Sequence, residues 1–286
     1  MDFGGQDNID LLVAEVDKLV SLPDVYYRLE TLIEHPSSTI ADFSQALSSD
    51  TDLCARLLSI ANSAFYSFPA SVESVERAVQ IIGTRQIREL VLATSVVRAF
   101  NDMPLGMVDM ESFWKHSVAV GVMAKCIAQY CNISQPERYY VAGLLHDIGR
   151  LVFFLKLSGL MHDMLLQRES QEKFLFELEF ENLGYTHAEA GGRLLEIWNV
   201  PMSIYEPVSC HHQPEMSMEF PQVTAAVHVA DAWVNQRNVG SSGERFALPI
   251  SADALQQLNL QSYELDEIWE LAEDEISDVL KLFLVQ

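Results

Sequence analysis

The 286-residue chain has few basic residues, since 18 Lys and Arg stand against 41 Asp and Glu and give a formal net charge of −23. Proteins that bind nucleic acids neutralise phosphates with Lys and Arg, so this balance disfavours direct binding to DNA or RNA. It disfavours an anionic membrane surface for the same reason. We therefore predict no direct nucleic-acid partner and no membrane partner, while a local basic pocket for a nucleotide or phosphate ligand stays compatible with the overall charge.

Cysteine is also scarce and shows no CxxC spacing. The four cysteines lie in apolar stretches of helical character: Cys54, Cys126, Cys131 and Cys210. Paired metal-binding or redox cysteines, and the disulfide framework of small secreted proteins, both need closer or more numerous cysteines than these. We expect four reduced, buried thiols, as in a cytoplasmic protein.

Long apolar runs are missing as well. A membrane-spanning helix needs about 18 or more apolar residues, and Lys156 interrupts the longest candidate, Leu151–Leu157. The N-terminus carries Asp2, Asp7 and Asp10 and lacks the basic and apolar regions of a signal peptide. The sequence therefore predicts a cytoplasmic location.

The sequence has no convincing alternating run of β-branched residues, whereas apolar residues recur at helical spacing, as in Ile9, Leu12, Val13 and Val16. Hydrophobic residues make up 49% of the chain, enough for a substantial core. We predict an all-α, multi-helix fold. The expected helices cover residues 9–20, 39–47, 53–61, 74–82, 84–100, 110–131, 136–148, 150–168, 171–182, 186–198, 201–210 and 221–237, with a further helix after 251.

A boundary is predicted at Asn101–Gly106, where Pro104 interrupts the helical pattern. We therefore expect an N-terminal helical half (1–106), a second helical half with the chemistry (107–240), and a C-terminal loop with an acidic helical tail (241–286). A Gly/Ser-containing loop is expected at Arg237–Pro249. The acidic stretch Glu264–Glu275 is more typical of a solvated helix face than of a site for a basic partner.

Histidine and aspartate recur in apolar helical stretches of the second half, where an unpaired polar group is costly to bury. They are His116, His146, Asp147, His187, His211, His212 and Asp231. Imidazole and carboxylate together suit Fe, Mn, Ni or Zn, so we predict one or two divalent metal ions. Taken singly, a histidine in a helix such as His116 is more often a hydrogen-bonded core or surface residue than a metal ligand. His35 and His162 are assigned no site, and His228 is either a core residue or a neighbour of the site.

The order of these motifs resembles the HD superfamily of metal-dependent phosphohydrolases, and residues 20–240 resemble its HDOD branch of signalling modules. Four segments carry the HDOD resemblance: Ser21–Pro23, Ser49–Leu53, Asn62–Tyr66 and Arg77–Gly83. The segments His187–Gly191 and His211–Glu215 are similar to those of HD-GYP phosphodiesterases, which hydrolyse cyclic di-GMP. The resemblance implies one metal held by His116, His146, Asp147 and Asp231, and a second, bridged by Asp147, held by His187 with His211 or His212 or both.

Two departures from the HD-GYP pattern bear on activity. Met216–Met218 stands where Gly-Tyr-Pro is expected, and Arg150 replaces the lysine three residues after the aspartate. The HDOD resemblance implies a signalling output module that acts mainly on a protein partner. The alternative is a phosphohydrolase that acts on cyclic dinucleotides, with Asp147 and Arg150 as catalytic residues. A diiron sensor or oxygenase is a third hypothesis, because His/carboxylate diiron sites also occur on this fold.

Overall fold

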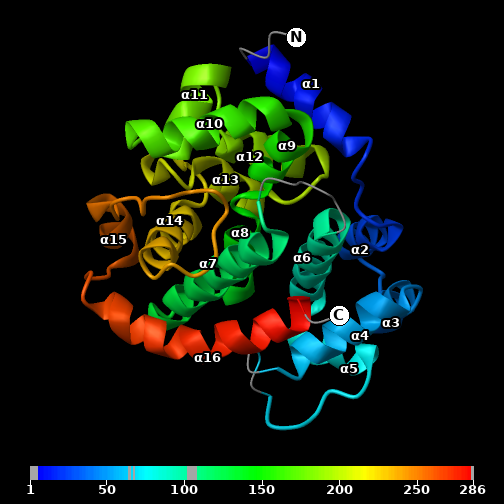
Figure 1. Cartoon of the computed structure of the whole chain (residues 1–286). Helices are drawn as coiled ribbons and strands as arrows, with labels where there is room; N and C mark the ends of the chain where they lie inside the picture. Colours follow the sequence, from blue (N-terminus) through cyan, green and yellow to red (C-terminus); the bar gives the residue numbers. More distant parts are fainter. Residues whose placement is uncertain (1–5, 64–65, 67, 102–107, 285–286) are drawn as a thin grey trace. The chain divides into compact units, whose positions relative to one another are not determined.

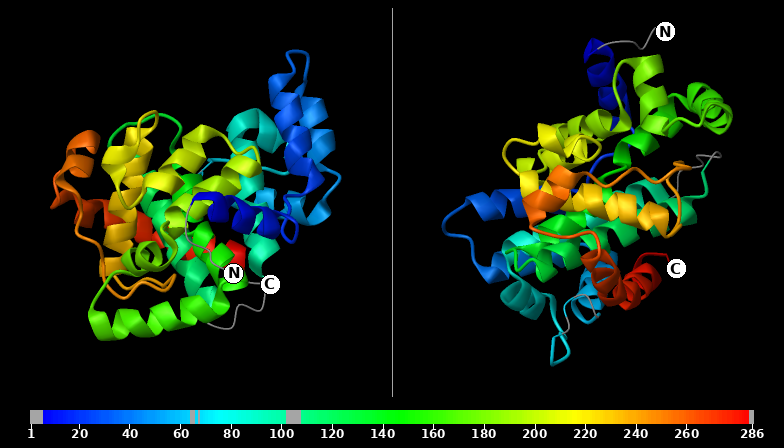
Figure 2. Two further views of the ribbon diagram at one scale, coloured as in Figure 1. Left: turned by 90° about the horizontal axis from the view of Figure 1, so that it is seen from above. Right: turned by 90° about the vertical axis from the view of Figure 1, so that its left-hand side faces the viewer.

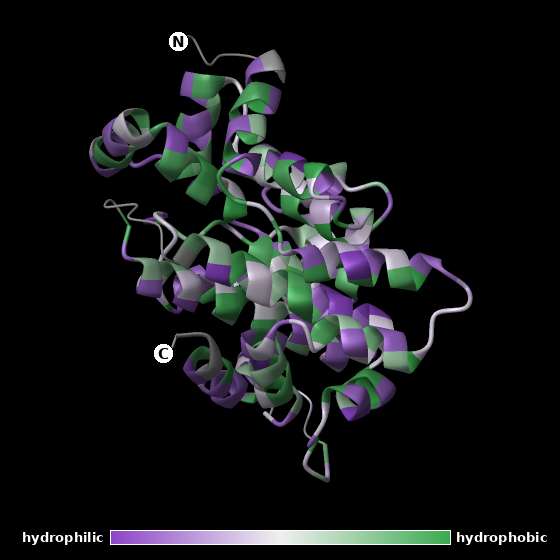
Figure 3. Cartoon of the chain, turned by 90° about the vertical axis from the view of Figure 1, so that its right-hand side faces the viewer, coloured by the Kyte–Doolittle hydropathy of each residue, from purple (hydrophilic) through white to green (hydrophobic). Residues whose placement is uncertain are grey.

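The structure is a computed structural model that describes residues 6–63, 66, 68–101 and 108–284 (Figure 1). Within these residues the chain is helical and contains no strand. The predicted all-α fold is therefore confirmed. None of the described helices is long and apolar enough to cross a membrane. Figure 3 shows hydrophilic and hydrophobic residues interspersed along the helices.

The chain divides into two compact units. The larger comprises residues 1–21 and 103–272, and the smaller comprises residues 22–102 and 273–286. The predicted boundary at Asn101–Gly106 falls mostly on residues 102–107, including Pro104, which lie outside the described residues. The predicted division into residues 1–106, 107–240 and 241–286 thus stays a prediction.

The larger unit contains most of the helices. They are α1 (Gln6–Asp17), α7 (Met110–Tyr130), α8 (Pro136–Leu145), α9 (Ile148–Lys156), α10 (Ser158–Gln171), α11 (Leu175–Leu183), α12 (His187–Ile197), α13 (Met202–Cys210), the short 3₁₀ helix η1 (Pro214–Met216), α14 (Pro221–Gln236) and α15 (Ala252–Leu258). The last helix, α16 (Glu264–Leu284), begins in this unit and ends in the smaller one.

Helix α7 forms the centre of the larger unit. Every residue from His116 to Ala128 is buried, which is typical of a helix covered on all sides. Helices α8 and α14 pack against α7, and α12 packs against both α9 and α13. Helix α15 lies beside α14 (Figures 1 and 2). These contacts bring helices from distant parts of the sequence together.

The smaller unit consists of α2 (Asp24–Glu34), α3 (Ile40–Leu47), α4 (Thr51–Ala61), α5 (Val75–Ile82), α6 (Thr84–Asn101) and the end of α16. Asn62 ends α4, and its carboxamide donates to Val72 O at 2.9 Å and accepts from Val72 N at 2.7 Å. It therefore fixes the loop that leads to α5. The Asn62–Tyr66 motif is only partly visible, because Ala64 and Phe65 lie outside the described residues.

Several details of the sequence prediction are wrong; for example, the helix expected over 171–182 begins at Leu175. The helix expected over 150–168 is two helices, because the backbone leaves helical geometry at Leu157 (φ −121°, ψ 33°). The four cysteines are free thiols, as expected, but only Cys126 is buried, and the other three are half-buried. Apolar periodicity does not distinguish a continuous helix from two helices that meet at an apolar residue.

Candidate metal centre

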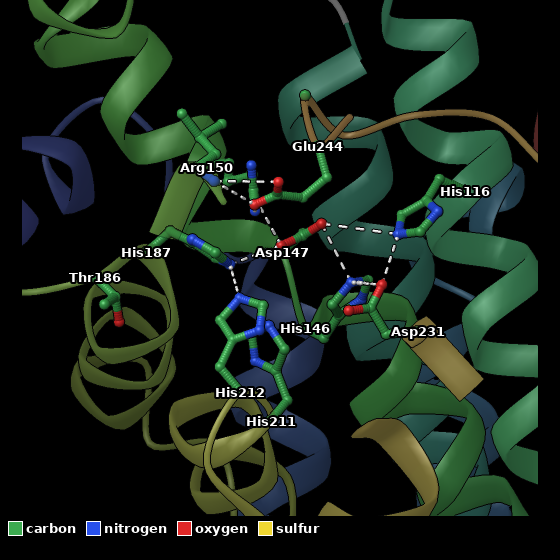
Figure 4. A network of polar contacts seen from close by, with 12 residues as sticks. His116, His146, Asp147, Arg150, Thr186, His187, His211, His212, Asp231 and Glu244 are labelled. Atoms are coloured by element: carbon green, nitrogen blue, oxygen red, sulfur yellow. Dashed lines mark hydrogen bonds and ion pairs between the residues drawn. The ribbon is translucent and has the colours of Figure 1, made fainter. Parts of the chain in front are cut away.

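All seven predicted metal ligands come together in the larger unit, at the centre shown in Figure 4. His116 comes from α7, His146 and Asp147 from the turn between α8 and α9, His187 from the start of α12, His211 and His212 from the end of α13, and Asp231 from α14. His212 is half-buried, and each of the other six is at most 5% exposed. Residues separated by up to 115 positions thus share one buried site.

The His146–Asp147 pair lies in a turn, whereas the sequence predicted a helix through residue 148. His146 follows the last residue of α8 (φ −55°, ψ −37°). Asp147 precedes the first residue of α9 and has φ −97°, ψ 11°. The turn points both side chains towards α7 and α12, so the helix break places the pair at the centre of the site.

Asp147 contacts histidines on two sides. Its Oδ2 lies 3.1 Å from His146 Nε2, and its Oδ1 lies 2.9 Å from His187 Nε2. On the far side of the centre, Asp231 Oδ1 lies 3.1 Å from His116 Nε2. The two carboxylates therefore connect all of the histidine-bearing elements except the end of α13.

Three of the histidines are held in the same way. The Nδ1 atoms of His146 and His211 lie 2.7 Å from the carbonyl oxygens of Gly143 and Val208. The Nδ1 of His187 lies 2.6 Å from Glu179 Oε2. A carbonyl or carboxylate oxygen accepts, so each Nδ1 carries a proton, and each Nε2 faces the centre. Metal-binding histidines are commonly oriented by such a bond from the other ring nitrogen.

The potential ligand atoms fall into three overlapping groups whose members lie within 4.8 Å of one another: His116–His146–Asp231, His146–Asp147–His211 and His187–His211–His212. Two ligands that each lie about 2.0–2.1 Å from one ion are roughly 3 Å apart. The 3.1 Å separation of His187 Nε2 and His212 Nε2 fits this spacing. His211 Nε2 is buried and has no hydrogen-bond partner among the described residues. The donor set therefore fits a divalent metal ion.

The centre also has an excess of buried negative charge. Burial alone would raise the pKa of Asp147, but His146 and Arg150 hold it well below its usual value. Burial alone would lower the pKa of His146, yet Asp147 and Asp231 raise it to about 10. Burial lowers the pKa of His211 to about 3, with His146 and His187 acting in the same direction. The carboxylates therefore favour positive charge at the centre, and a metal ion would displace the proton from His146.

Arg150, which the sequence analysis named as a catalytic residue, is fully buried beside Asp147. Its Nε donates to Asp147 Oδ1 at 3.0 Å. Its Nη2 donates to Glu244 Oε1 at 2.7 Å. Burial alone would lower the pKa of Arg150, but the carboxylates of Asp147, Glu244 and Glu179 raise it. The guanidinium therefore stays charged between two carboxylates.

Three polar residues at the centre were not predicted from the sequence. Glu179, which is fully buried on α11, holds His187; Glu244 pairs with Arg150; and Asn235 donates to Asp231 Oδ1 at 2.7 Å. A glutamate directly after the buried Leu178 was an available signal for Glu179. Glu244 lies in a loop, where no periodicity marks a buried residue.

The remaining histidines lie outside the ligand groups. His35 and His162 are exposed, in keeping with the interpretation that they serve no site. His228 is buried, and its Nδ1 lies 2.8 Å from His211 O. It is therefore a neighbour of the site that supports the backbone of a candidate ligand.

The fold and the site together define a class of protein. Its members are all-helical and hold a buried cluster of histidines and carboxylates. The family model of the HDOD domain matches residues 19–214, so the chain belongs to the HDOD domain family. Among known proteins, an uncharacterised protein of Treponema pallidum is 23% identical over 223 residues, which are 76% of this chain but only 42% of that protein.

Solved structures share the fold. An HDOD domain protein of unknown function from Geobacter sulfurreducens has a TM-score of 0.78 at 22% identity and covers 98% of this chain and 99% of its own. A Shewanella amazonensis protein, classed provisionally as a phosphohydrolase, has a TM-score of 0.72 at 22% identity and covers 95% and 96% of the two chains. At this sequence identity the structural similarity establishes the fold alone. The function must be inferred from the residues of the centre.

Proposed function

We propose that this protein is a metal-binding HDOD module that holds one or two divalent ions at the buried centre and acts mainly as a regulatory output element on a signalling protein partner. The metal part is supported by one observation above all. His146, His187 and His211 each use Nδ1 to bond a protein oxygen and direct Nε2 to the same centre. The regulatory output role is proposed because the chain belongs to the HDOD family, and resemblance to that family implies a signalling module.

The proposed ligands are His116, His146, Asp147, His187, His211, His212 and Asp231. Fe, Mn, Ni and Zn all accept a donor set of imidazole and carboxylate. Burial of the ligands favours a metal that stabilises the module or sets its state, because a hydrolytic metal keeps an open coordination position. The partner would then respond to a surface that depends on whether the centre is loaded.

Elemental analysis tests the metal site. We expect about one or two equivalents of a first-row divalent metal in protein purified without chelator or a metal-affinity column, and loss of that metal in His146→Ala. His162→Ala is the matched control, because His162 is exposed in the same unit and should leave the content unchanged. Wild-type protein without metal, even after reconstitution with each ion, would refute the assignment.

Replacing Glu179 by Gln should weaken metal binding without abolishing it. Glu179 accepts from both Nδ1 and the backbone N of His187, at 2.6 and 2.8 Å. Loss of the carboxylate charge makes Nε2 of His187 a poorer ligand, and substitutions of this kind cost about 10–100-fold in metal affinity. Competition with a chromophoric chelator measures this change. Glu181→Gln, an exposed change on the same helix, should not alter the affinity.

A metal-dependent phosphohydrolase with a dinuclear site is the second candidate function. The observation that favours it is Asp147, whose two oxygens face His146 and His187 separately. A carboxylate in this position is suited to bridging two ions, and bound divalent ions supply Lewis acidity. Asp147 would hold the ions and the attacking water, and Arg150 would contact the reacting phosphate group. Hydrolysis of a cyclic dinucleotide by metal-loaded wild type, lost in Asp147→Ala, would support this candidate over the purely regulatory one.

A further inference from the structure

The segment between α14 and α15, residues 238–251, forms a strap over the metal centre, and it contains neither helix nor strand. At Gly240 the strap lies against α7, because a Cβ atom there would fall 2.5 Å from His116 N. Ser241 N donates to Ser112 O at 3.1 Å. At its far end, Ser251 N lies 3.1 Å from His228 Nε2. The strap therefore starts beside one candidate ligand and ends on a histidine that supports another.

Glu244 is the acidic side chain that the strap sends into the protein, as Figure 4 shows. Its side chain is 5% exposed. One carboxylate oxygen accepts from Arg150 Nη2 at 2.7 Å. Both oxygens accept from the backbone N of Leu175, the first residue of α11, at 3.0 and 3.1 Å. A guanidinium and a helix N-terminus thus converge on one carboxylate.

The same donors suit a tetrahedral oxyanion. Arginine binds phosphate and carboxylate through the same planar fork, and a helix N-terminus favours either anion. Donors are in surplus here, since Nη1 of the fully buried Arg150 has no hydrogen-bond partner among the described residues. A phosphate has more acceptor oxygens than the single carboxylate that now fills this position.

We propose that Glu244 occupies an anion-binding position on Arg150 and the start of α11, and that a phosphate-type oxyanion displaces it and releases the strap. The exchange is tolerable electrostatically, because the Glu244 carboxylate leaves as the phosphate enters, so a dianion adds one negative charge. The inference rests on the proposed function to this extent: the metal ions would balance that added charge. The conformation of the strap at the protein surface would then depend on whether the anion is bound.

Titration of inorganic phosphate into the metal-loaded full chain tests the proposal, with metal content measured on the same samples. In Glu244→Gln the internal competitor loses its charge but keeps its size. We expect phosphate to bind this variant about ten-fold or more tightly than wild type, as the loss of one charged hydrogen bond implies. Glu270→Gln, also a glutamate-to-glutamine change but exposed on α16, should bind phosphate as wild type does.

Equal phosphate affinity in wild type and Glu244→Gln would overturn the inference, because phosphate bound only to metal would not sense Glu244. So would the absence of phosphate binding in both proteins when their metal content is normal. Absence of metal would instead refute the proposed function.

Hydrogen exchange on the wild type gives an independent test that does not need the variant to fold. Phosphate should speed exchange of the amides of residues 239–246 relative to chloride at equal ionic strength. Unchanged exchange at saturating phosphate would also overturn the proposal.

Discussion

Asp147→Ala should lower the free energy of unfolding by about 3–5 kcal/mol, because it removes one partner of a buried charge pair. Asp147 is 2% exposed and Arg150 is fully buried. The variant leaves the guanidinium with Glu244 as its remaining hydrogen-bonded partner. The cost is large because the remaining charge cannot reach water. Urea denaturation with chelator present in every sample measures this effect apart from any contribution of bound metal.

Asp163→Ala is the matched control for this prediction. Asp163 is exposed on α10 of the same unit, and a change at such a surface position alters stability by no more than about 0.5 kcal/mol. If Asp147→Ala in chelator behaved like this control, Arg150 would not depend on Asp147 for its charge compensation. A loss seen only in the absence of chelator would assign the whole effect to the metal ion.

Gly149→Ala is expected to disrupt the centre through the backbone. A Cβ atom at Gly149 would lie 1.9 Å from His187 O and 2.7 Å from Gly191 N, so α9 and α12 would have to separate. These helices carry Asp147 and His187 to their 2.9 Å contact. Overpacking of this kind costs about 1–3 kcal/mol and can cost more where the obstacle is backbone. We expect a lower melting temperature together with weaker metal binding.

Gly159→Ala provides the comparison, since nothing lies within 4 Å of a Cβ atom at that position on α10. Alanine is the better helix former, so its stability should be equal or slightly higher. Both variants add one methyl group to a helical glycine. If the two melted alike and bound metal alike, the close approach of α9 and α12 would not determine the geometry of the centre.

The helical fold was predictable because apolar spacing records which face of each helix is buried. Helices α3 and α5 begin where the sequence indicated, since the hydroxyls of Thr39 and Ser74 accept from backbone N–H groups of the first turn. The break at Leu157 was missed because that residue is apolar and buried and keeps helical spacing to the buried Phe153 and Phe154. The periodicity of apolar residues indicates which face of a helix is buried. It carries little information on where one apolar helix ends and the next begins.

The candidate ligands were predictable for a different reason. A histidine or aspartate in an apolar stretch needs compensation, so His116 and Asp231 were conspicuous in the sequence. Glu179 has the same property but lies in a helix between two exposed glutamates, Glu177 and Glu181, which conceal it. Glu244 could not be predicted at all, because its burial depends on the path of a loop across helices distant in sequence.

The larger unit is built from two separate stretches of the sequence, residues 1–21 and 103–272. This constrains the order in which the chain can fold during synthesis. Helix α1 packs against α12, and Asp10 and Asp17 bond Arg193 and Trp198 of that region. At about 5–20 residues per second, the roughly 170 residues between Asp17 and His187 take on the order of 10–30 s to emerge from the ribosome. During that interval Leu12 and Val16, which are buried in the final structure, have no partner on α12. Helix α1 therefore cannot complete its packing until α12 has been synthesised, and part of its apolar face stays uncovered until then.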